Sequence, residues 1–128
     1  MTEWIDPSFP LQDAIGFTID SADGVSTATV ELSAFHLNPN GAVHGAIPFT
    51  LMDTAMGGAV MSTIQDGRRC ATIEMQTRFH RPALDGTLTA TARVITAGKR
   101  VIHLAAETRD DHDRIVASAT ASFAVFEM

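Results

Sequence analysis

One segment, Gly45 to Ile64 (GAIPFTLMDTAMGGAVMSTI), limits the possible folds more than any other part of the sequence. Asp53 is its only charged residue, and apolar or small residues occupy every side of the helical wheel. A helix of this kind is buried inside a domain. Pro48 fits the first turn of a helix, where its missing N–H costs nothing, so we expect one long central helix at about 46–64.

The segments around this helix predict strands and short turns. Four of them follow Asp66-Gly67 and are rich in Thr, Val, Ile and Phe, and their short connections favour antiparallel neighbours. The predicted elements are a short helix at 7–16 ending at Gly16, strands at 17–20 and 25–32 around a turn at 21–24, a loop at 33–45, and strands at 68–81, 86–97, 100–110 and 114–128. We therefore predict a single α+β domain over 1–128, in which an antiparallel sheet of five to six strands packs on the helix.

Charge and cysteine content narrow the function classes. The 9 Lys and Arg against 15 Asp and Glu give a net charge of −6 with no basic run, which argues against a nucleic-acid or anionic-membrane partner. Cys70 is the only cysteine, so no intrachain disulfide can form. The N-terminus lacks the pattern of a signal peptide, and no apolar run is long enough for a membrane span. We expect a soluble, cytoplasmic protein.

The carboxylate of Asp53 is the unusual feature of the helix. Buried without partners, it would cost several kcal/mol or take up a proton at a raised pKa. A structural role is one interpretation, with backbone donors or an arginine from the sheet satisfying the charge. Gly57-Gly58 is a second oddity, since each glycine costs a helix about 1 kcal/mol, and it predicts that another backbone or a ligand approaches closely there.

The residues before the helix favour a functional interpretation instead. Asn38, Gly41, His44 and Gly45 lead directly into the helix N-terminus. Unpaired backbone N–H groups and the helix dipole favour negative charge at such an end. An oxyanion formed during a reaction is one such charge.

These residues carry a resemblance to a known family. The pattern N-x-x-G-x-V-H-G at 38–45, followed by an apolar helix with an Asp nine residues after the His, resembles the hotdog-fold acyl-CoA thioesterases of the phenylacetate-degradation type. The strand ATIEMQTRFHRPA (71–83) also ends in Arg-Pro-Ala, as it often does in that family. Ala46 departs from the family's usual His-Gly-Gly. The resemblance implies a hotdog fold, hydrolysis of an acyl thioester and no cofactor.

The resemblance also implies roles for five residues. Asp53 matches the catalytic carboxylate, acting as nucleophile on the thioester or as general base for water, and the sequence leaves both open. Gly45 matches the glycine whose N–H polarises the carbonyl. Asn38 matches the asparagine that places water or the carbonyl, and His44 the histidine that shapes the loop. Thr72 falls where relatives carry Ser or Thr near the carboxylate.

The spacing of Gly45 and Asp53 predicts an oligomer. Eight residues of helix span about 12 Å, whereas one carbonyl group must lie about 3 Å from both the oxyanion donor and the attacking group. If both residues act, one chain supplies Gly45 and another supplies Asp53. The simplest solution is a two-fold dimer. The family resemblance adds a tetramer, built as a dimer of dimers.

Further residues are weaker candidates for substrate contacts. Phe49 and Met56 suit an aryl or aliphatic acyl pocket, although residues at this helical spacing are more often core. Arginine suits phosphate groups, so the cations after the helix are candidates for contacts with coenzyme A. These cations are Arg78, Arg81, Lys99 and Arg100. We expect Cys70 to be a core thiol, and the scattered histidines predict no metal site.

Two other functions remain open at this stage. A hotdog hydratase or dehydratase would pair an acid with a nearby histidine, but Gly58 lies five residues after Asp53 and His36 precedes the helix. A non-catalytic module that binds acyl-CoA is the second alternative. The acyl group, and whether the carrier is CoA or another thiol, are also open.

Overall fold

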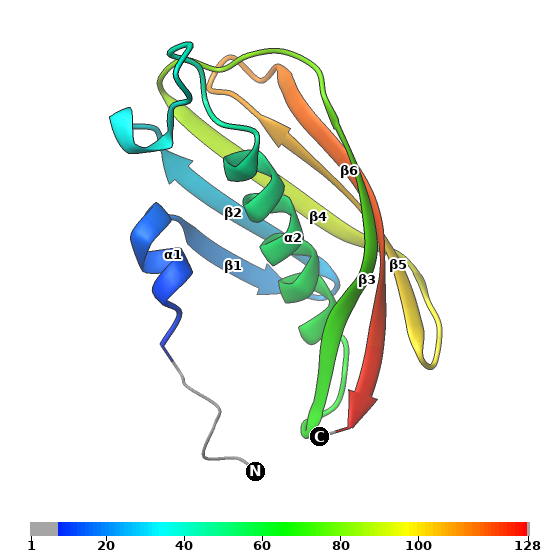
Figure 1. Cartoon of the computed structure of the whole chain (residues 1–128). Helices are drawn as coiled ribbons and strands as arrows, with labels where there is room; N and C mark the ends of the chain where they lie inside the picture. The colour runs from blue at the N-terminus through cyan, green and yellow to red at the C-terminus, as the bar shows by residue number, and fades with distance from the viewer. Residues whose placement is uncertain (1–7, 128) are drawn as a thin grey trace.

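The computed structural model describes residues 8–127 as one curved antiparallel sheet around a central helix (Figure 1). The elements in chain order are α1 (Pro10–Ile15), β1 (Thr18–Ala22), β2 (Val25–Glu31), a 3₁₀ turn (Ala34–His36), α2 (Ala46–Met61), β3 (Arg68–Phe79), β4 (Thr87–Ala97), β5 (Val101–Arg109) and β6 (Ile115–Glu127). Pro7 and Met128, which end two of the predicted elements, lie outside the described residues. The predicted α+β class is confirmed.

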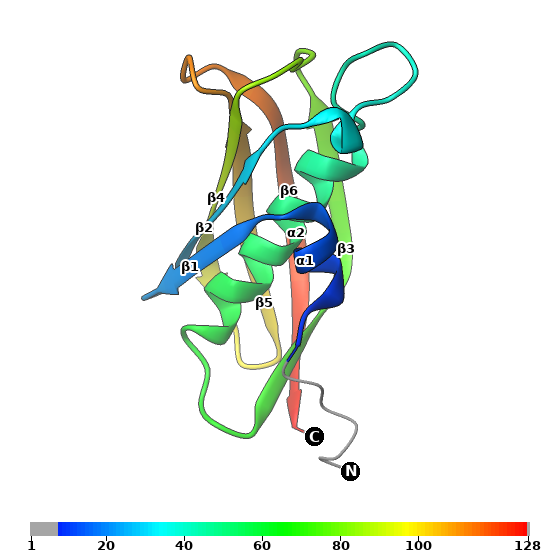
Figure 2. The ribbon, with the colours of Figure 1, turned by 90° about the vertical axis from the view of Figure 1, so that its left-hand side faces the viewer.

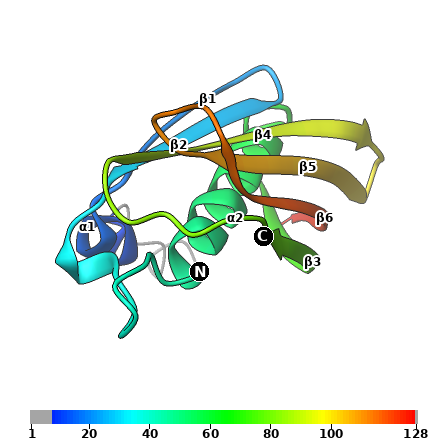
Figure 3. The ribbon, with the colours of Figure 1, turned by 90° about the horizontal axis from the view of Figure 1, so that it is seen from above.

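The six strands form one sheet in the order β1-β2-β4-β5-β6-β3, and every neighbouring pair is antiparallel. The sheet curves around α2, which contacts all six strands, and no described element covers the opposite face (Figures 2 and 3). Leu51, Met52 and Met56 of α2 are fully buried in the core between helix and sheet. The hotdog arrangement expected from the sequence is therefore present. β1 and β3 are its two edge strands.

Helix α2 ends at Met61, three residues before the predicted end. The hydroxyls of Ser62 and Thr63 donate to the carbonyls of Ala59 and Val60, both at 2.8 Å. These bonds satisfy carbonyls of the last turn, so the chain can leave the helix there. Ser62 Oγ also accepts the Gly24 N–H at 2.8 Å, which ties the helix end to the β1–β2 turn.

The first hairpin turns later than predicted. β1 continues to Ala22, and the turn consists of Asp23 and Gly24, with φ of 54° and 80°. Positive φ at both positions is the geometry of a tight two-residue hairpin, which favours Asp-Gly. The predicted loop at 33–45 also contains the unpredicted 3₁₀ turn, closed by His36, whose Nδ1 accepts the Ser33 N–H at 2.9 Å.

A close approach occurs at Gly58, as predicted for Gly57-Gly58, but side chains approach there and not the backbone or ligand that was expected. A methyl group on Gly58 would lie 2.5 Å from Ser21 Oγ and 2.9 Å from Ser26 Oγ, two hydroxyls that are hydrogen-bonded to each other at 2.7 Å. A methyl group on Gly57 would be 3.7 Å from the Phe123 ring, an ordinary contact. The β1–β2 hairpin therefore requires a glycine at 58 but not at 57.

Candidate active site

Asp53 and Thr72 meet where α2 passes the edge strand β3. Thr72 Oγ1 donates a 2.7 Å hydrogen bond to Asp53 Oδ1, and both residues lie on the helix side of β3. Within residues 8–127 this is the only hydrogen bond of the Asp53 side chain. The second carboxylate oxygen, Oδ2, is thus free to accept a proton or to attack.

Asp53 is half-buried, which corrects the expectation of a fully buried carboxylate. The reason is the sheet order, since β3 is an edge strand and no described strand of the same chain lies beyond it. The side of α2 that carries Asp53 is therefore left partly uncovered. Water reaches the charge, so the burial cost expected from the sequence does not arise in one chain.

Cys70 lies two residues before Thr72 on the same side of β3. Its Sγ is 3.9 Å from the Gly57 carbonyl, and the half-buried side chain packs against the core, as predicted for a core thiol. Burial, and secondarily the negative charge of Asp53, raise the pKa of the Cys70 thiol. The thiol therefore remains protonated at neutral pH, the opposite of what a nucleophilic cysteine requires.

The first turn of α2 leaves one backbone donor open. Ala46 N–H donates to His44 Nδ1 at 2.9 Å, Ile47 N–H donates to the His44 carbonyl at 2.9 Å, and Pro48 has no N–H. Gly45 N–H has no acceptor among the described residues. A free N–H at the positive end of a helix is suited to hold a developing oxyanion.

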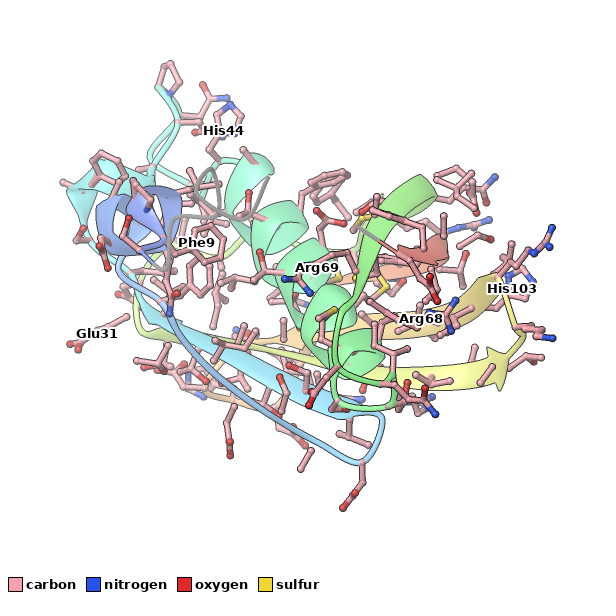
Figure 4. All side chains as sticks on the ribbon, turned by 90° about the horizontal axis from the view of Figure 1, so that it is seen from below. Phe9, Glu31, His44, Arg68, Arg69 and His103 are labelled. Atoms are coloured by element: carbon pink, nitrogen blue, oxygen red, sulfur yellow. The ribbon has the colours of Figure 1, made fainter. Side chains whose placement is uncertain are left out.

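His44 and Asn38 shape the loop before this open donor. His44 is exposed beside the first turn of α2 (Figure 4). Because its Nδ1 accepts a hydrogen bond from the Ala46 N–H, the neutral ring carries its proton on Nε2. Asn38 Oδ1 accepts the N–H groups of Asn40 and Ala42, at 2.9 and 3.3 Å. Only the Nδ2 group of Asn38 is left to contact a ligand, as a donor.

A hollow of about 390 Å³ opens beside Gly45. Phe79 forms part of it, and a methyl group on Gly45 would lie 3.2 Å from the tip of the Phe79 ring. The other lining residues include Asn38, Pro48, His80, Arg81 and Pro82. Predicted residues Asn38, Gly45 and Arg81 thus share one hollow, which has the size of a small-molecule site.

A comparison with protein families decides the affiliation. The family model described as the thioesterase superfamily matches residues 40–117, a range that includes Gly45, Asp53 and Thr72. This chain belongs to the thioesterase superfamily.

Individual relatives of the chain are consistent with this assignment to the superfamily. The chain is 35% identical over 118 residues to a candidate esterase of Halobacterium salinarum, covering 84% of this chain and 78% of the relative. It is 30% identical over 88 residues to a candidate esterase of Saccharolobus solfataricus, covering 67% of this chain. The match spans only 57% of the length of the Saccharolobus protein.

Solved structures show the same architecture. A phenylacetic acid degradation-related protein of Ralstonia eutropha, described as a candidate thioesterase, has a TM-score of 0.84 and 28% identity over 93% of this chain and 92% of its own. A Bacillus halodurans protein solved with CoA has the same TM-score and identity, over 93% of this chain and 77% of its own.

The residues that were predicted as weaker candidates for substrate contacts are scattered over the structure. Phe49 is partly exposed on α2, whereas Met56 has no exposed surface and belongs to the core, which corrects its assignment to a pocket. Arg78 lies on the outer face of the sheet, opposite Ser118, and not on the side of Asp53. Lys99 and Arg100 form the β4–β5 turn, at the end of the sheet away from Gly45 (Figure 1). Of the four cations, only Arg81 lines the hollow.

Among the lining residues that were not predicted to belong to the site are Phe79 and His80. Phe79 and His80 follow one another at the end of β3, directly before the Arg-Pro-Ala motif. Their position next to that motif is the one sequence signal that pointed to them. His80 Nε2 lies 2.8 Å from Ser118 Oγ, which holds its ring at the rim.

His36 and Asp110 have structural roles. His36 is buried, with Nδ1 accepting from Ser33 N–H and Nε2 lying 2.7 Å from the Ile15 carbonyl, so it fastens α1 to the 3₁₀ turn. Asp110 accepts hydrogen bonds from the N–H groups of His112 and Arg114 and from the Arg114 guanidinium in the β5–β6 turn.

Residues 8–127 contain no group of three or more His, Cys, Asp or Glu side chains arranged to bind a metal. No helix in this part of the chain is long and apolar enough to cross a membrane.

Proposed function

We propose that the thioesterase hydrolyses an acyl-CoA, or a related acyl thioester, to the free acid and the thiol. The observation that carries this proposal is the open Gly45 N–H, which faces a hollow at the N-terminus of α2. A thioester carbonyl bound there would place its developing negative charge against the N–H and the helix dipole. The CoA-bound protein of Bacillus halodurans supports a CoA carrier.

Asp53 is the catalytic carboxylate in this proposal, either as a general base or as a nucleophile. As general base, its Oδ2 takes a proton from water while the water oxygen attacks the carbonyl carbon; the C–S bond then breaks, and the thiolate leaves with the proton. As nucleophile, Oδ2 attacks the carbon itself, releases the thiolate and leaves a mixed anhydride that water hydrolyses. In both routes the hydrogen bond from Thr72 orients the carboxylate through Oδ1.

The two parts of the site come from different chains. Gly45 and Asp53 lie on the same helix, about 12 Å apart along its axis, so one chain cannot present both to one carbonyl. We propose a two-fold dimer with two equivalent sites, assembled further into a tetramer as a dimer of dimers. Asn38 and His44 then belong to the oxyanion end of each site, and Thr72 to the Asp53 end.

Asp53→Asn tests the function because it keeps the size of the side chain and removes the base and the nucleophile. With a thiol-release assay on a panel of acyl-CoA substrates, we expect kcat to fall by about 10²–10⁴-fold with an unchanged circular dichroism spectrum. Near-normal turnover by the variant would refute the proposal. Hydration of crotonyl-CoA by the native protein would assign a hydratase instead, and tight acyl-CoA binding without turnover would assign a binding module.

Isotope labelling tests the nucleophilic route. In a single turnover in H₂¹⁸O with enzyme in excess, the outcome of this route depends on where water attacks the anhydride. Attack at the aspartyl carbon puts ¹⁸O on Asp53 and leaves the acid unlabelled, whereas attack at the acyl carbon labels the acid alone, as the general-base route does. Label on the peptide that contains Asp53, detected by mass spectrometry, would therefore assign the nucleophilic route with attack at the aspartyl carbon.

A further inference from the structure

Three polar side chains line the hollow beside Gly45, and none of them is acidic. They are Asn38, His80 and Arg81. The chain as a whole has 15 Asp and Glu residues and a net charge of −6, so a hollow without a single carboxylate is a local exception. This combination favours a ligand group that carries a negative charge.

Arg81 supplies the positive charge of the hollow. Its side chain is exposed and forms no ion pair or hydrogen bond with any residue in the described part of the chain. A guanidinium presents a planar fork of N–H donors that matches a carboxylate or a phosphate. Arg81 is therefore free to bind an anionic oxygen group.

Asn38 and His80 offer further donors to the same group. The Oδ1 atom of Asn38 already accepts two backbone N–H groups, so its amide nitrogen is the part that can reach a ligand. His80 Nε2 lies 2.8 Å from Ser118 Oγ, and the other ring nitrogen, Nδ1, has no partner among the described residues. When Nε2 accepts from the Ser118 hydroxyl, Nδ1 carries the proton and is a donor.

The nearest carboxylates line a different hollow. That second hollow, of about 190 Å³, contains Asp85, Asp110 and Asp111 and shares only Pro82 with the first. None of these carboxylates forms an ion pair with Arg81. The acidic groups of this region therefore leave the charge of Arg81 available to a ligand.

The remaining walls of the hollow are apolar. Val43, Pro48 and Val116 are buried and contribute to it, and the ring of Phe79 covers the side next to Gly45. Apolar walls that end in a few polar groups are typical of sites for small molecules, in which the polar groups fix the orientation of the ligand. Such a hollow suits methylene groups that end in a charged group.

The spacing of Gly45 and Arg81 limits the length of that chain. A methyl group on Gly45 would lie 3.2 Å from the Phe79 ring, and Arg81 follows Phe79 by two residues, on the same side of an extended chain and about 6–7 Å further along. An extended carbon chain advances about as far as a backbone, roughly 3.3–3.6 Å for three bonds, so about five or six carbons reach from a carbonyl at Gly45 to Arg81. The phosphates of CoA are separated from the thioester by many more bonds.

We propose that the hollow holds the terminal carboxylate of the acyl chain, bound by Arg81 with help from Asn38 and His80. The substrate is then the half thioester of a short dicarboxylic acid. This inference rests on the proposed function for the position of the thioester carbonyl at Gly45. The charge and the apolar walls of the hollow support it independently, and they make Arg81 a residue that determines specificity for the acyl group.

Matched pairs of substrates test the specificity. We expect kcat/KM of the native enzyme to be at least about tenfold higher for glutaryl-CoA and adipoyl-CoA than for pentanoyl-CoA and hexanoyl-CoA, which have the same numbers of carbons and no carboxylate. Rates are corrected for hydrolysis without enzyme. Arg81→Gln should lose about tenfold or more on the dicarboxylic substrates and change little on the neutral ones. Arg81→Lys keeps the charge without the fork and should lie between the two.

Arg78→Gln is the matched control. It removes the same charge three positions earlier, from the outer face of the sheet, and Arg78 does not line the hollow beside Gly45. We expect this variant to keep the native preference for dicarboxylic substrates.

Binding of the free acids tests the hollow without turnover. In isothermal titration calorimetry, we expect glutarate to bind at least about tenfold more tightly than pentanoate, because only glutarate has a second carboxylate for Arg81. Arg81→Gln should remove this difference, and Arg78→Gln should keep it. Equal binding of the two acids by the native protein would contradict the proposal.

The outcomes separate this inference from the proposed function. Equal turnover of dicarboxylic and neutral substrates would overturn the inference and leave thioester hydrolysis intact. An equal loss on both kinds of substrate in Arg81→Gln, absent with pantetheine thioesters that lack the phosphates, would assign Arg81 to a phosphate of CoA and also overturn it. Arg81-dependent binding of glutarate without hydrolysis of any thioester would support the carboxylate site and reject the proposed function.

Discussion

Thr72 Oγ1 lies 2.7 Å from Asp53 Oδ1 and links strand β3 to helix α2 across 19 positions of the chain. This hydrogen bond engages one carboxylate oxygen and leaves the other open. It also places Asp53 at the edge of the sheet, where a second chain can reach it. Removing this hydrogen bond therefore tests whether it orients the Asp53 carboxylate.

Thr72→Val removes the hydroxyl and keeps the shape of the side chain. We expect kcat to fall about tenfold because the carboxylate loses its orienting donor, which contributes about 1.5 kcal/mol in a charge-assisted bond. Thr72→Ser keeps the hydroxyl and should retain most of the native kcat. Steady-state kinetics on one acyl-CoA checks both variants, and equal activity of the Val and native enzymes would reject the orienting role.

Gly45→Ala adds a methyl group that meets the Phe79 ring at 3.2 Å. We expect kcat/KM to fall at least tenfold, because the contact pushes the backbone N–H away from its target. Phe79→Leu in the same chain makes room and should recover part of the loss. The comparison of single and double variants measures the coupling, and additive effects would show that the two residues act separately.

Gly57→Ala and Gly58→Ala are expected to have opposite effects on stability. Alanine at 57 makes an ordinary contact and should stabilise the helix by up to about 1 kcal/mol. Alanine at 58 meets the Ser21 and Ser26 hydroxyls at 2.5 and 2.9 Å and should destabilise the protein by about 1–3 kcal/mol. Thermal unfolding of both variants checks the difference in sign.

Cys70 should react slowly with alkylating reagents, because burial and the nearby Asp53 carboxylate raise the pKa of its thiol. A raised pKa lowers the thiolate fraction at any given pH, and only the thiolate reacts. Asp53→Asn removes the smaller of the two causes, so its labelling by iodoacetamide at pH 8 should be faster than that of the native protein. Equal labelling rates would show that the Asp53 charge does not affect the pKa of the Cys70 thiol.

Asp110→Asn tests the β5–β6 turn. The Arg114 N–H, the Arg114 guanidinium and the His112 N–H all favour the charged form, and they lower the pKa of Asp110 below its usual 3.8 against the effect of burial. A lowered pKa stabilises the folded state above the unfolded-state value, and this stabilisation is lost as the pH falls through the folded-state value. We expect the variant to melt at a lower temperature than the native protein at pH 7, with the gap in melting temperature narrowing as the pH falls below 3.8 and through the lower folded-state pKa. A gap that is constant over this range would exclude the charge as its cause.

The sequence predicted the architecture because its strongest signals are local. An apolar helix with one charge, alternating strands and short turns leave little choice other than a sheet around a helix, and the six strands are confirmed. The approach at Gly58 was also visible, since two glycines in a helix cost stability without a reason to be there.

The surroundings of Asp53 were not predictable in the same way. Its partial exposure depends on β3 pairing with β6, some fifty residues away along the chain, and on β3 then lying at an edge. Phe79 was missed for the same reason, because it lines the hollow beside Gly45 although it lies on another element. Arg78 was assigned by its chemistry alone. The face on which it lies is set by a bulge in β3, where Thr72 pairs with Phe123 and Glu74 with Ser122, so that Ile73 between them is an extra residue with no partner on β6.

The extra residue at Ile73 makes the proposed site sensitive to a deletion of a single residue. Deleting this one codon would leave every proposed catalytic residue in the chain, and the remaining strand would still have the length to pair with β6. The side chains on one side of the deletion would nevertheless exchange faces, so that Thr72 and Phe79 could no longer both point toward a helix. Deletion of Ile73 alone would therefore abolish the proposed activity, although every proposed catalytic residue would still be present in the sequence.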